Sequence, residues 1–153
     1  LFVRESKDFL QKYFKKELFF TDVEGKTKDE VLKNLCRKVE QEKGLPETFT
    51  ASVLKREELT PTDYGNLVAL PHPERAFQER AFVAVAVLKE PIFWFRQKVQ
   101  VVFLTAIGRE EDENLQQFYE ATTDLILRPA DVQNLIRHPD YDRLIQLLRR
   151  AEE

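Results

Sequence analysis

Three segments in the middle of the chain constrain its fold more than any other feature. They read LVAL at 67–70, FVAVAVL at 82–88 and VQVVFLTAI at 99–107, and they are rich in β-branched residues and almost continuously apolar. Strands that lack polar alternation are usually covered on both faces. The three segments therefore predict an α/β fold in which a central mixed β-sheet is flanked by helices on both sides.

Segments with helical periodicity lie before and after this strand region. The clearest is 27–43, where Thr27 and Glu30 form a capping box and Gly44 ends the apolar stripe. Further helices are expected at 6–20, with Ser6 as its N-cap, and at 46–57, 111–127, 129–138 and 140–151. The aromatic segment KEPIFWFRQK at 89–98 is expected to form a short edge strand or a hairpin.

Length, charge and cysteine content exclude several classes of protein. At 153 residues the chain suits one domain over 1–153, and its net charge of −3, with both signs interspersed, argues against direct contact with nucleic acid. A lone Cys36 on a predicted apolar helix face indicates a core thiol in the cytoplasm. No apolar run approaches the roughly 20 residues that cross a bilayer, so no membrane insertion is expected.

Two further absences shape the functional interpretation. The chain has no paired histidine motif, cysteine cluster or glycine-rich phosphate loop, so zinc hydrolysis and nucleotide binding have little support and no metal or cofactor is expected. The sequence also begins at Leu1 and contains no Met. We therefore expect this domain to come from a larger protein.

His72 is the candidate nucleophile. It follows Pro71 at the end of the apolar run 67–70, where a side chain would emerge at the rim of a sheet. One nitrogen of a neutral imidazole can accept a group while a hydrogen bond holds the other. A histidine in a purely structural role is the commoner case, and position alone does not decide between the two. The other histidine, His138, is expected to be a solvated loop residue.

The residues before His72 suit a phosphoryl group. Arg56 at the end of a predicted helix supplies a fixed cation, Thr60 and Thr62 supply hydroxyls, and Gly65 gives the loop a flexible backbone. Phosphoryl transfer asks a protein mainly for positioning and charge stabilisation.

The segment REELTPTDYGNLVALPH, residues 56–72, resembles the active-site segment of the mannitol/fructose-type enzyme IIA domains of the bacterial sugar phosphotransferase system. The resemblance covers about residues 18–150. It implies that His72 takes a phosphoryl group from the phosphocarrier protein HPr and can pass it to an enzyme IIB cysteine. It also implies that Arg56 steadies the phosphoryl group, and it matches Thr62 and Gly65 to the Thr and Gly of the family's loop.

Three positions depart from the pattern of transporter members. Asn114 stands where many of them carry a second histidine, so we expect it near His72 but without an imidazolium charge. Leu67 fills a usual glycine position, and Pro73, which has no backbone N–H, follows the histidine.

The wording GNLVALPHP is more similar to enzyme IIA-like modules at the C-terminal ends of antiterminator-type transcriptional regulators that contain regulation domains (PRDs). We therefore favour a regulatory phosphorylation domain whose partners include other domains of the same regulator. The alternatives are a genuine enzyme IIA component of a sugar transporter, and an interaction domain with no phosphoryl chemistry.

Overall fold

Two long antiparallel strands, β4 (Phe82–Phe93) and β5 (Lys98–Ala106), form the centre of the sheet in the computed structural model, which describes residues 10–150. β1 (Phe14–Phe20) pairs with β4 in parallel, and β3 (Val68–Ala69) pairs with β5 in parallel. β2 (Asp63–Gly65) pairs antiparallel with β3, so the strand order is β1-β4-β5-β3-β2. The predicted mixed sheet is confirmed.

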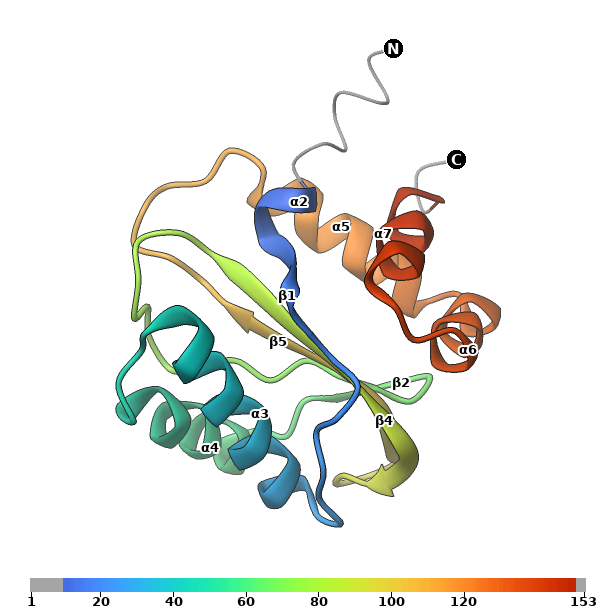
Figure 1. Cartoon of the computed structure of the whole chain (residues 1–153), viewed down its shortest axis with the longest axis horizontal. Coiled ribbons are helices and arrows are strands. Elements are labelled where there is room, and N and C mark those ends of the chain that lie inside the picture. The colour runs from blue at the N-terminus through green and yellow to red at the C-terminus, as the bar shows by residue number, and fades with distance from the viewer. Residues whose placement is uncertain (1–9, 151–153) are drawn as a thin grey trace.

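Helices cover both faces of this sheet, as predicted, and α3 and α4 lie on the opposite side from α5, α6 and α7 (Figure 1). They are α2 (Leu10–Tyr13), α3 (Lys28–Lys43), α4 (Thr48–Leu59), α5 (Leu115–Ile126), α6 (Pro129–Arg137) and α7 (Tyr141–Arg150). Side chains of β4 alternate between two apolar clusters: Val83, Val85 and Val87 face α5 and α7, whereas Ala84, Ala86 and Leu88 face α3 and α4. This two-sided burial explains why the strand sequence lacks polar alternation.

The predicted caps of α3 are present. The Oγ1 atom of Thr27 accepts a hydrogen bond from the backbone N–H of Glu30 at 3.2 Å, and the Glu30 carboxylate accepts from the N–H of Lys26 at 3.1 Å. Gly44 ends the helix in the left-handed conformation, with φ at 66°. Both ends of α3 therefore follow from local sequence.

The prediction of one helix over 6–20 is wrong from Phe14 onward, where the chain forms β1. Phe14 and Leu18 have helical spacing, yet they enter the two different clusters on opposite faces of the sheet. In a regular strand, residues four apart lie on the same face of the sheet. The register with β4 shifts between Phe14 and Phe19, and this irregularity turns Phe14 and Leu18 to opposite faces. The proposed N-cap Ser6 lies outside the described residues.

The aromatic segment 89–98 forms the tip of the β4–β5 hairpin. After a register shift between Val87 and Ile92, pairing resumes and continues to Phe93, opposite Lys98. The N–H of Trp94 donates to the carbonyl of Gln97 at 3.0 Å. Trp94 is buried, whereas the neighbouring phenylalanines at 93 and 95 are exposed. The hairpin alternative is therefore the correct one.

Two other sequence expectations concern the environment of Cys36 and the presence of a membrane-spanning helix. Cys36 is a free, buried thiol in the cluster beneath α3, and this burial raises the pKa of the thiol. Within residues 10–150, no helix combines the length and apolarity needed to span a bilayer.

The turn between β2 and β3 uses an unusual residue. Asn66 and Leu67 have φ values of 53° and 70°, and the flanking residues Gly65 and Val68 pair with each other. A two-residue hairpin loop with both φ values positive is the type I′ turn, which favours Asn-Gly. The side chain of Asn66 also donates to the Ile126 carbonyl at the end of α5, at 2.6 Å. Leu67 thus occupies a glycine-favouring conformation.

We expect Leu67→Gly to leave the free energy of unfolding unchanged or to raise it by up to about 1.5 kcal/mol. Relief of a left-handed leucine is worth roughly 1–2 kcal/mol, and the backbone entropy lost by glycine costs about 0.5–1 kcal/mol. Leu67→Val should instead destabilise by about 1–3 kcal/mol, because a β-branched residue is poorly accommodated there. Urea unfolding measures both. Equal destabilisation by the two variants would show that side-chain contacts, rather than φ, dominate at this position.

Candidate functional site

His72 lies just beyond β3, beside the end of β5. The N–H of Thr105 donates to the carbonyl of Pro71 at 3.0 Å, which holds the Pro-His pair against the central sheet. The half-buried imidazole lines a pocket of about 460 Å³. The lining residues are Pro61, Thr62, Asp63, Tyr64, Leu70, His72, Thr105, Ile107, Phe118, Tyr119, Thr122 and Thr123.

One hydrogen bond defines the tautomer of His72. Its Nδ1 atom lies 3.0 Å from the carbonyl oxygen of Pro73. A carbonyl can only accept, so Nδ1 carries the proton and the neutral ring leaves its lone pair on Nε2. Pro73 has no backbone N–H to donate, but its carbonyl is the acceptor that orients the imidazole.

The polar lining of the pocket consists mainly of hydroxyl groups. Thr62 comes from the loop before β2, Thr105 from β5 and Tyr119 from α5. Burial raises the pKa of Tyr119, so its hydroxyl stays protonated and can donate. Neither lysine nor arginine is among the residues that line this pocket. Asp63, whose carboxylate accepts from the backbone of the β4–β5 hairpin, is the acidic residue of this lining, and the other polar side chains around the imidazole carry hydroxyl groups.

A buried carboxylate that the sequence interpretation missed holds Thr62 in place. Glu57 is only 1% exposed, and its two oxygens accept from the Thr62 N–H at 2.6 Å and from the Thr62 hydroxyl at 2.8 Å. It also accepts from the indole N–H of Trp94 at 2.8 Å. Glu57 is part of the Arg-Glu pair at the start of the recognised segment, but only tertiary structure shows that it is buried.

Arg56 points elsewhere. Its Nη1 atom donates to the carbonyl of Thr60 at 2.9 Å, so the guanidinium spans the end of α4 and does not line the pocket. The structure brings Thr62 and His72 to one pocket, and it leaves Arg56 on the adjoining loop. Gly65, the other expected loop residue, adopts a φ of 133° in β2, where glycine is favoured.

Asn114 lies at the N-terminus of α5, one turn before the pocket residue Phe118. Its amide oxygen accepts from Lys12 at 3.1 Å, and its amide nitrogen donates to Gln117 at 2.8 Å. These contacts belong to a separate hollow beside α2. The structure therefore does not bring Asn114 into the pocket that contains His72.

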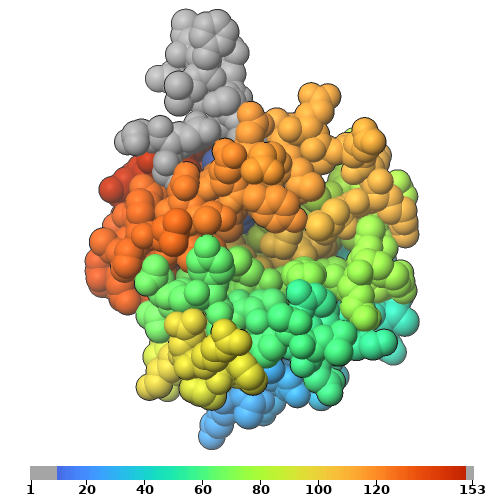
Figure 2. All heavy atoms as spheres, turned by 180° about the vertical axis from the view of Figure 1, so that it is seen from behind, coloured from blue at the N-terminus to red at the C-terminus, as the bar shows by residue number. Residues whose placement is uncertain are grey.

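The segments around His72 form one continuous surface. Figure 2 shows the green region that contains β2 and β3 between the orange part of α5 and the yellow tip of the β4–β5 hairpin. Asp63 joins two of these parts, because its carboxylate accepts from the backbone N–H groups of Arg96 and Gln97 at 2.6 and 3.1 Å. The loop before His72 is thus braced against the hairpin.

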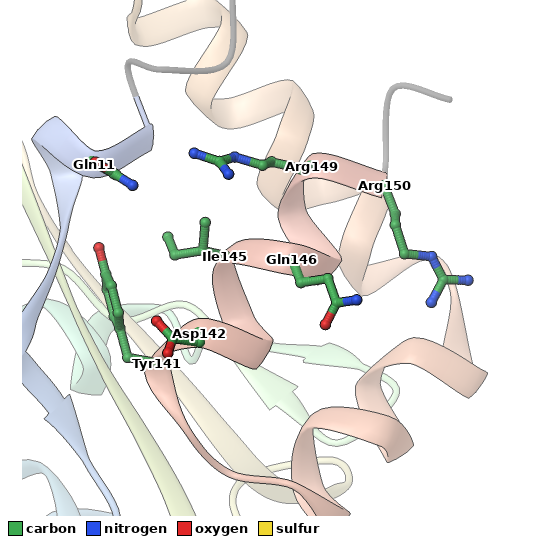
Figure 3. A pocket seen from close by; sticks show the side chains of 7 residues that line it. All are labelled: Gln11, Tyr141, Asp142, Ile145, Gln146, Arg149 and Arg150. Carbon is green, nitrogen blue, oxygen red and sulfur yellow. The ribbon is translucent and has the colours of Figure 1, made fainter. Parts of the chain in front are cut away.

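The remaining candidate features lie away from this surface. A hollow of about 430 Å³ lies between α2 and α7, where polar and charged side chains such as Gln11, Asp142 and Arg149 surround Ile145 (Figure 3). It contains neither histidine. His138 is exposed just after α6, as expected. Within residues 10–150, no three side chains of His, Cys, Asp or Glu are grouped to hold a metal ion.

The chain matches the family described as "Phosphoenolpyruvate-dependent sugar phosphotransferase system, EIIA 2" over residues 12–151. It belongs to this family. The match includes both the Pro-His pair and the loop before it, so the resemblance seen in the sequence is confirmed.

Two curated relatives of this EIIA 2 chain are regulators from Bacillus subtilis (strain 168). It is 36% identical over 140 residues to "Probable licABCH operon regulator", covering 92% of this chain and 22% of the relative. It is 27% identical over 120 residues to "Transcriptional regulator ManR", covering 78% of this chain and 18% of the relative. The chain thus spans about a fifth of the length of these relatives.

Solved structures agree with the fold of this EIIA 2 domain. The structure of the nitrogen regulatory protein IIA-Ntr from Neisseria meningitidis has a TM-score of 0.76 at 18% identity, covering 92% of this chain and 99% of that one. A complex of enzyme IIAMTL and phosphorylated enzyme IIBMTL from Escherichia coli has a TM-score of 0.72 at 18% identity, covering 88% and 97%.

We expect Asn114→His to raise the rate at which His72 is phosphorylated, because an imidazole at this position can add a positive charge one helical turn from the pocket residue Phe118. The rate is measured as the amount of radiolabelled phosphoryl group incorporated into the chain over time. Asn114→Gln, which keeps an uncharged amide, is the matched control and should behave like the unmodified chain. Equal rates for all three proteins would show that this position does not influence the pocket.

Proposed function

We propose that this EIIA 2 domain accepts a phosphoryl group on Nε2 of His72 from a phosphohistidine carrier such as HPr, and that the modification regulates a sugar-operon transcriptional regulator. The observation that carries the proposal is the hydrogen bond between Nδ1 of His72 and the Pro73 carbonyl. It leaves the other nitrogen with a lone pair in a pocket lined by hydroxyl groups.

The transfer step exchanges one nitrogen–phosphorus bond for another. The lone pair on Nε2 of His72 attacks phosphorus, while the bond from phosphorus to the carrier's imidazole breaks and its electron pair returns to that ring. The attacking ring becomes more positive as the new bond forms. The Pro73 carbonyl, 3.0 Å from Nδ1, stabilises this charge through the hydrogen bond already present.

The pocket supplies donors for the phosphoryl oxygens. The hydroxyl groups of Thr62, Thr105 and Tyr119 line it. The Arg56 side chain is partly exposed, and its contact with the Thr60 carbonyl is a single hydrogen bond. The guanidinium can give up this bond and turn towards a phosphoryl group. Thr62 and Arg56 are therefore proposed to bind the phosphoryl group, and Asn114 to modulate the site from the N-terminal end of α5.

Two findings favour regulation over sugar transport. The relatives described above include two transcriptional regulators that are more than four times as long as the matched part. The departures at Leu67, Pro73 and Asn114 also separate this chain from the pattern of transporter members. We therefore propose that residues 1–153 form one domain of a larger cytoplasmic regulator, whose other domains are its partners.

The runner-up function is that of an enzyme IIA component that passes the phosphoryl group to an enzyme IIB cysteine. The fold similarity to enzyme IIAMTL in complex with phosphorylated enzyme IIBMTL supports an interaction of this kind. Both functions use the same histidine and differ in where the phosphoryl group goes.

We expect incubation of the chain with enzyme I, HPr and labelled phosphoenolpyruvate to give an acid-labile phosphohistidine. His72→Ala should abolish the label, because only this imidazole lies in the hydroxyl-lined pocket. His138→Ala, which changes an exposed loop, is the matched control and should retain it. If the label persisted in His72→Ala and vanished in His138→Ala, the acceptor would be His138 and the proposal would be wrong.

In the full-length regulator, we expect His72→Ala and His72→Asp to give different transcription of the controlled operon with similar amounts of folded protein. A phosphoryl group brings up to about two negative charges, and aspartate reproduces part of that change. Reporter transcription is the measurement. If both variants left transcription unchanged while His72→Ala abolished sugar phosphorylation in a reconstituted transporter, the transport function would replace the regulatory one.

A further inference from the structure

The Glu57 carboxylate connects the wall of the His72 pocket to the β4–β5 hairpin. Its two oxygens accept three short hydrogen bonds: two from the N–H and O–H of Thr62 and one from the indole N–H of Trp94. All three distances lie between 2.6 and 2.8 Å, so each is a close hydrogen bond. A group with three donors aimed at it cannot be exchanged for an apolar residue without leaving those donors unpaired.

These contacts fix the direction of the Thr62 hydroxyl. Because a carboxylate only accepts, the Thr62 O–H must donate to Glu57 in the unmodified chain, and its lone pairs are then left for the pocket. A phosphoryl group on His72 presents oxygens that also only accept. Lone pairs facing such a group repel it, so the hydroxyl must turn.

We propose that Glu57 is a positioning residue that competes with the phosphoryl group for the Thr62 hydroxyl proton. This inference rests on the proposed phosphorylation of His72. When the phosphoryl group arrives, the hydroxyl donates to it instead, and the oxygen Oε1 of Glu57 loses a hydrogen bond. The carboxylate keeps its bonds to the Thr62 N–H and to Trp94, whose environment therefore changes with the phosphorylation state.

The change reaches the surface at the hairpin tip. Trp94 is buried, but Phe93 and Phe95 on either side of it are 63% and 50% exposed. A rearrangement at Glu57 is therefore transmitted to a segment that carries large apolar side chains in solvent. The chain contains a single tryptophan, so one indole N–H resonance reports on this contact.

The test uses the whole chain with His138→Ala as background. Potassium phosphoramidate transfers its phosphoryl group to imidazole with release of ammonia, so the test requires no carrier protein. Mass spectrometry measures modification of His72, and a ¹H–¹⁵N spectrum follows the indole N–H of Trp94. We expect a second indole resonance at a new position, whose intensity grows in proportion to modification. A resonance that stays in place on the fully modified chain would overturn the proposal.

Two variants of Thr62 separate the hydroxyl from other effects of charge. Thr62→Val removes the proton that is shared, so modification of His72 should no longer move the Trp94 resonance beyond a small residual shift. Thr62→Ser keeps the hydroxyl and should restore the full shift. An equal shift in the valine variant would show that the phosphoryl charge acts on Trp94 by another route, and the proposal would fail.

Glu57→Gln provides an independent measurement. Its amide oxygen can keep the two N–H contacts, while its NH₂ group donates to the Thr62 oxygen and turns the hydroxyl proton towards the pocket. We expect the phosphohistidine to hydrolyse about two- to tenfold more slowly, the range for one hydrogen bond, and the indole shift on modification to shrink. An unchanged or faster hydrolysis would contradict the proposed competition.

These results are distinguishable from failure of the proposed function. If HPr does not label His72 but phosphoramidate modification still moves the Trp94 resonance in a Thr62-dependent way, the carrier is wrong and the role of Glu57 stands. If HPr labels His72 and the resonance does not move, the proposed function stands and the inference about Glu57 is wrong.

Discussion

The pairing of β4 with β5 is the constraint on which the rest of this structure depends. Both strands are apolar on both faces over most of their length, so neither face can meet water and each requires a layer of helices. The parallel neighbours β1 and β3 then extend the sheet on either side. The hydrogen bond from Thr105 of β5 to the Pro71 carbonyl continues this order to the residue just before His72.

The site is built at the place where this order ends. His72 comes after the last paired residue of β3, so its ring and the carbonyl of Pro73 can contact each other outside the strand ladder. Support comes from three directions: β5 through Thr105, α5 through Tyr119, and α4 through Glu57, which holds Thr62 of the following loop. A rigid sheet thus positions an imidazole whose surroundings are loops, which is how binding residues are commonly presented.

The departures from the transporter pattern acquire physical meanings in three dimensions. Leu67 takes a left-handed conformation without the help of glycine, and the bond from Asn66 to the end of α5 anchors the same turn. Pro73 withholds a donor from the site but offers its carbonyl to Nδ1 of His72. Asn114 makes hydrogen bonds to Lys12 and Gln117 through a neutral amide, whereas a histidine at this position could carry a positive charge. Membership of the EIIA 2 family is therefore compatible with a site that differs from that of a transporter component.

Local sequence was sufficient to determine much of the fold. The caps of α3, the strands β4 and β5 and the helices after Gly108 follow from patterns within single segments, and the Pro-His pair marked His72 as the candidate nucleophile. The sequence could not reveal β1, because the register shift against β4 imitates helical spacing between Phe14 and Leu18. It also could not place Arg56 and Asn114 relative to the pocket.

Only the tertiary structure decided the contacts of the site, because they join residues far apart in the chain. Glu57 reads as an ordinary charge near the end of a helix, yet packing of the hairpin over α4 buries it and aims the indole of Trp94 at its carboxylate. The same packing determines which way the Thr62 hydroxyl points. The sequence by itself determined which residues can do chemistry, whereas the direction of their hydrogen bonds depends on distant partners that no local pattern encodes.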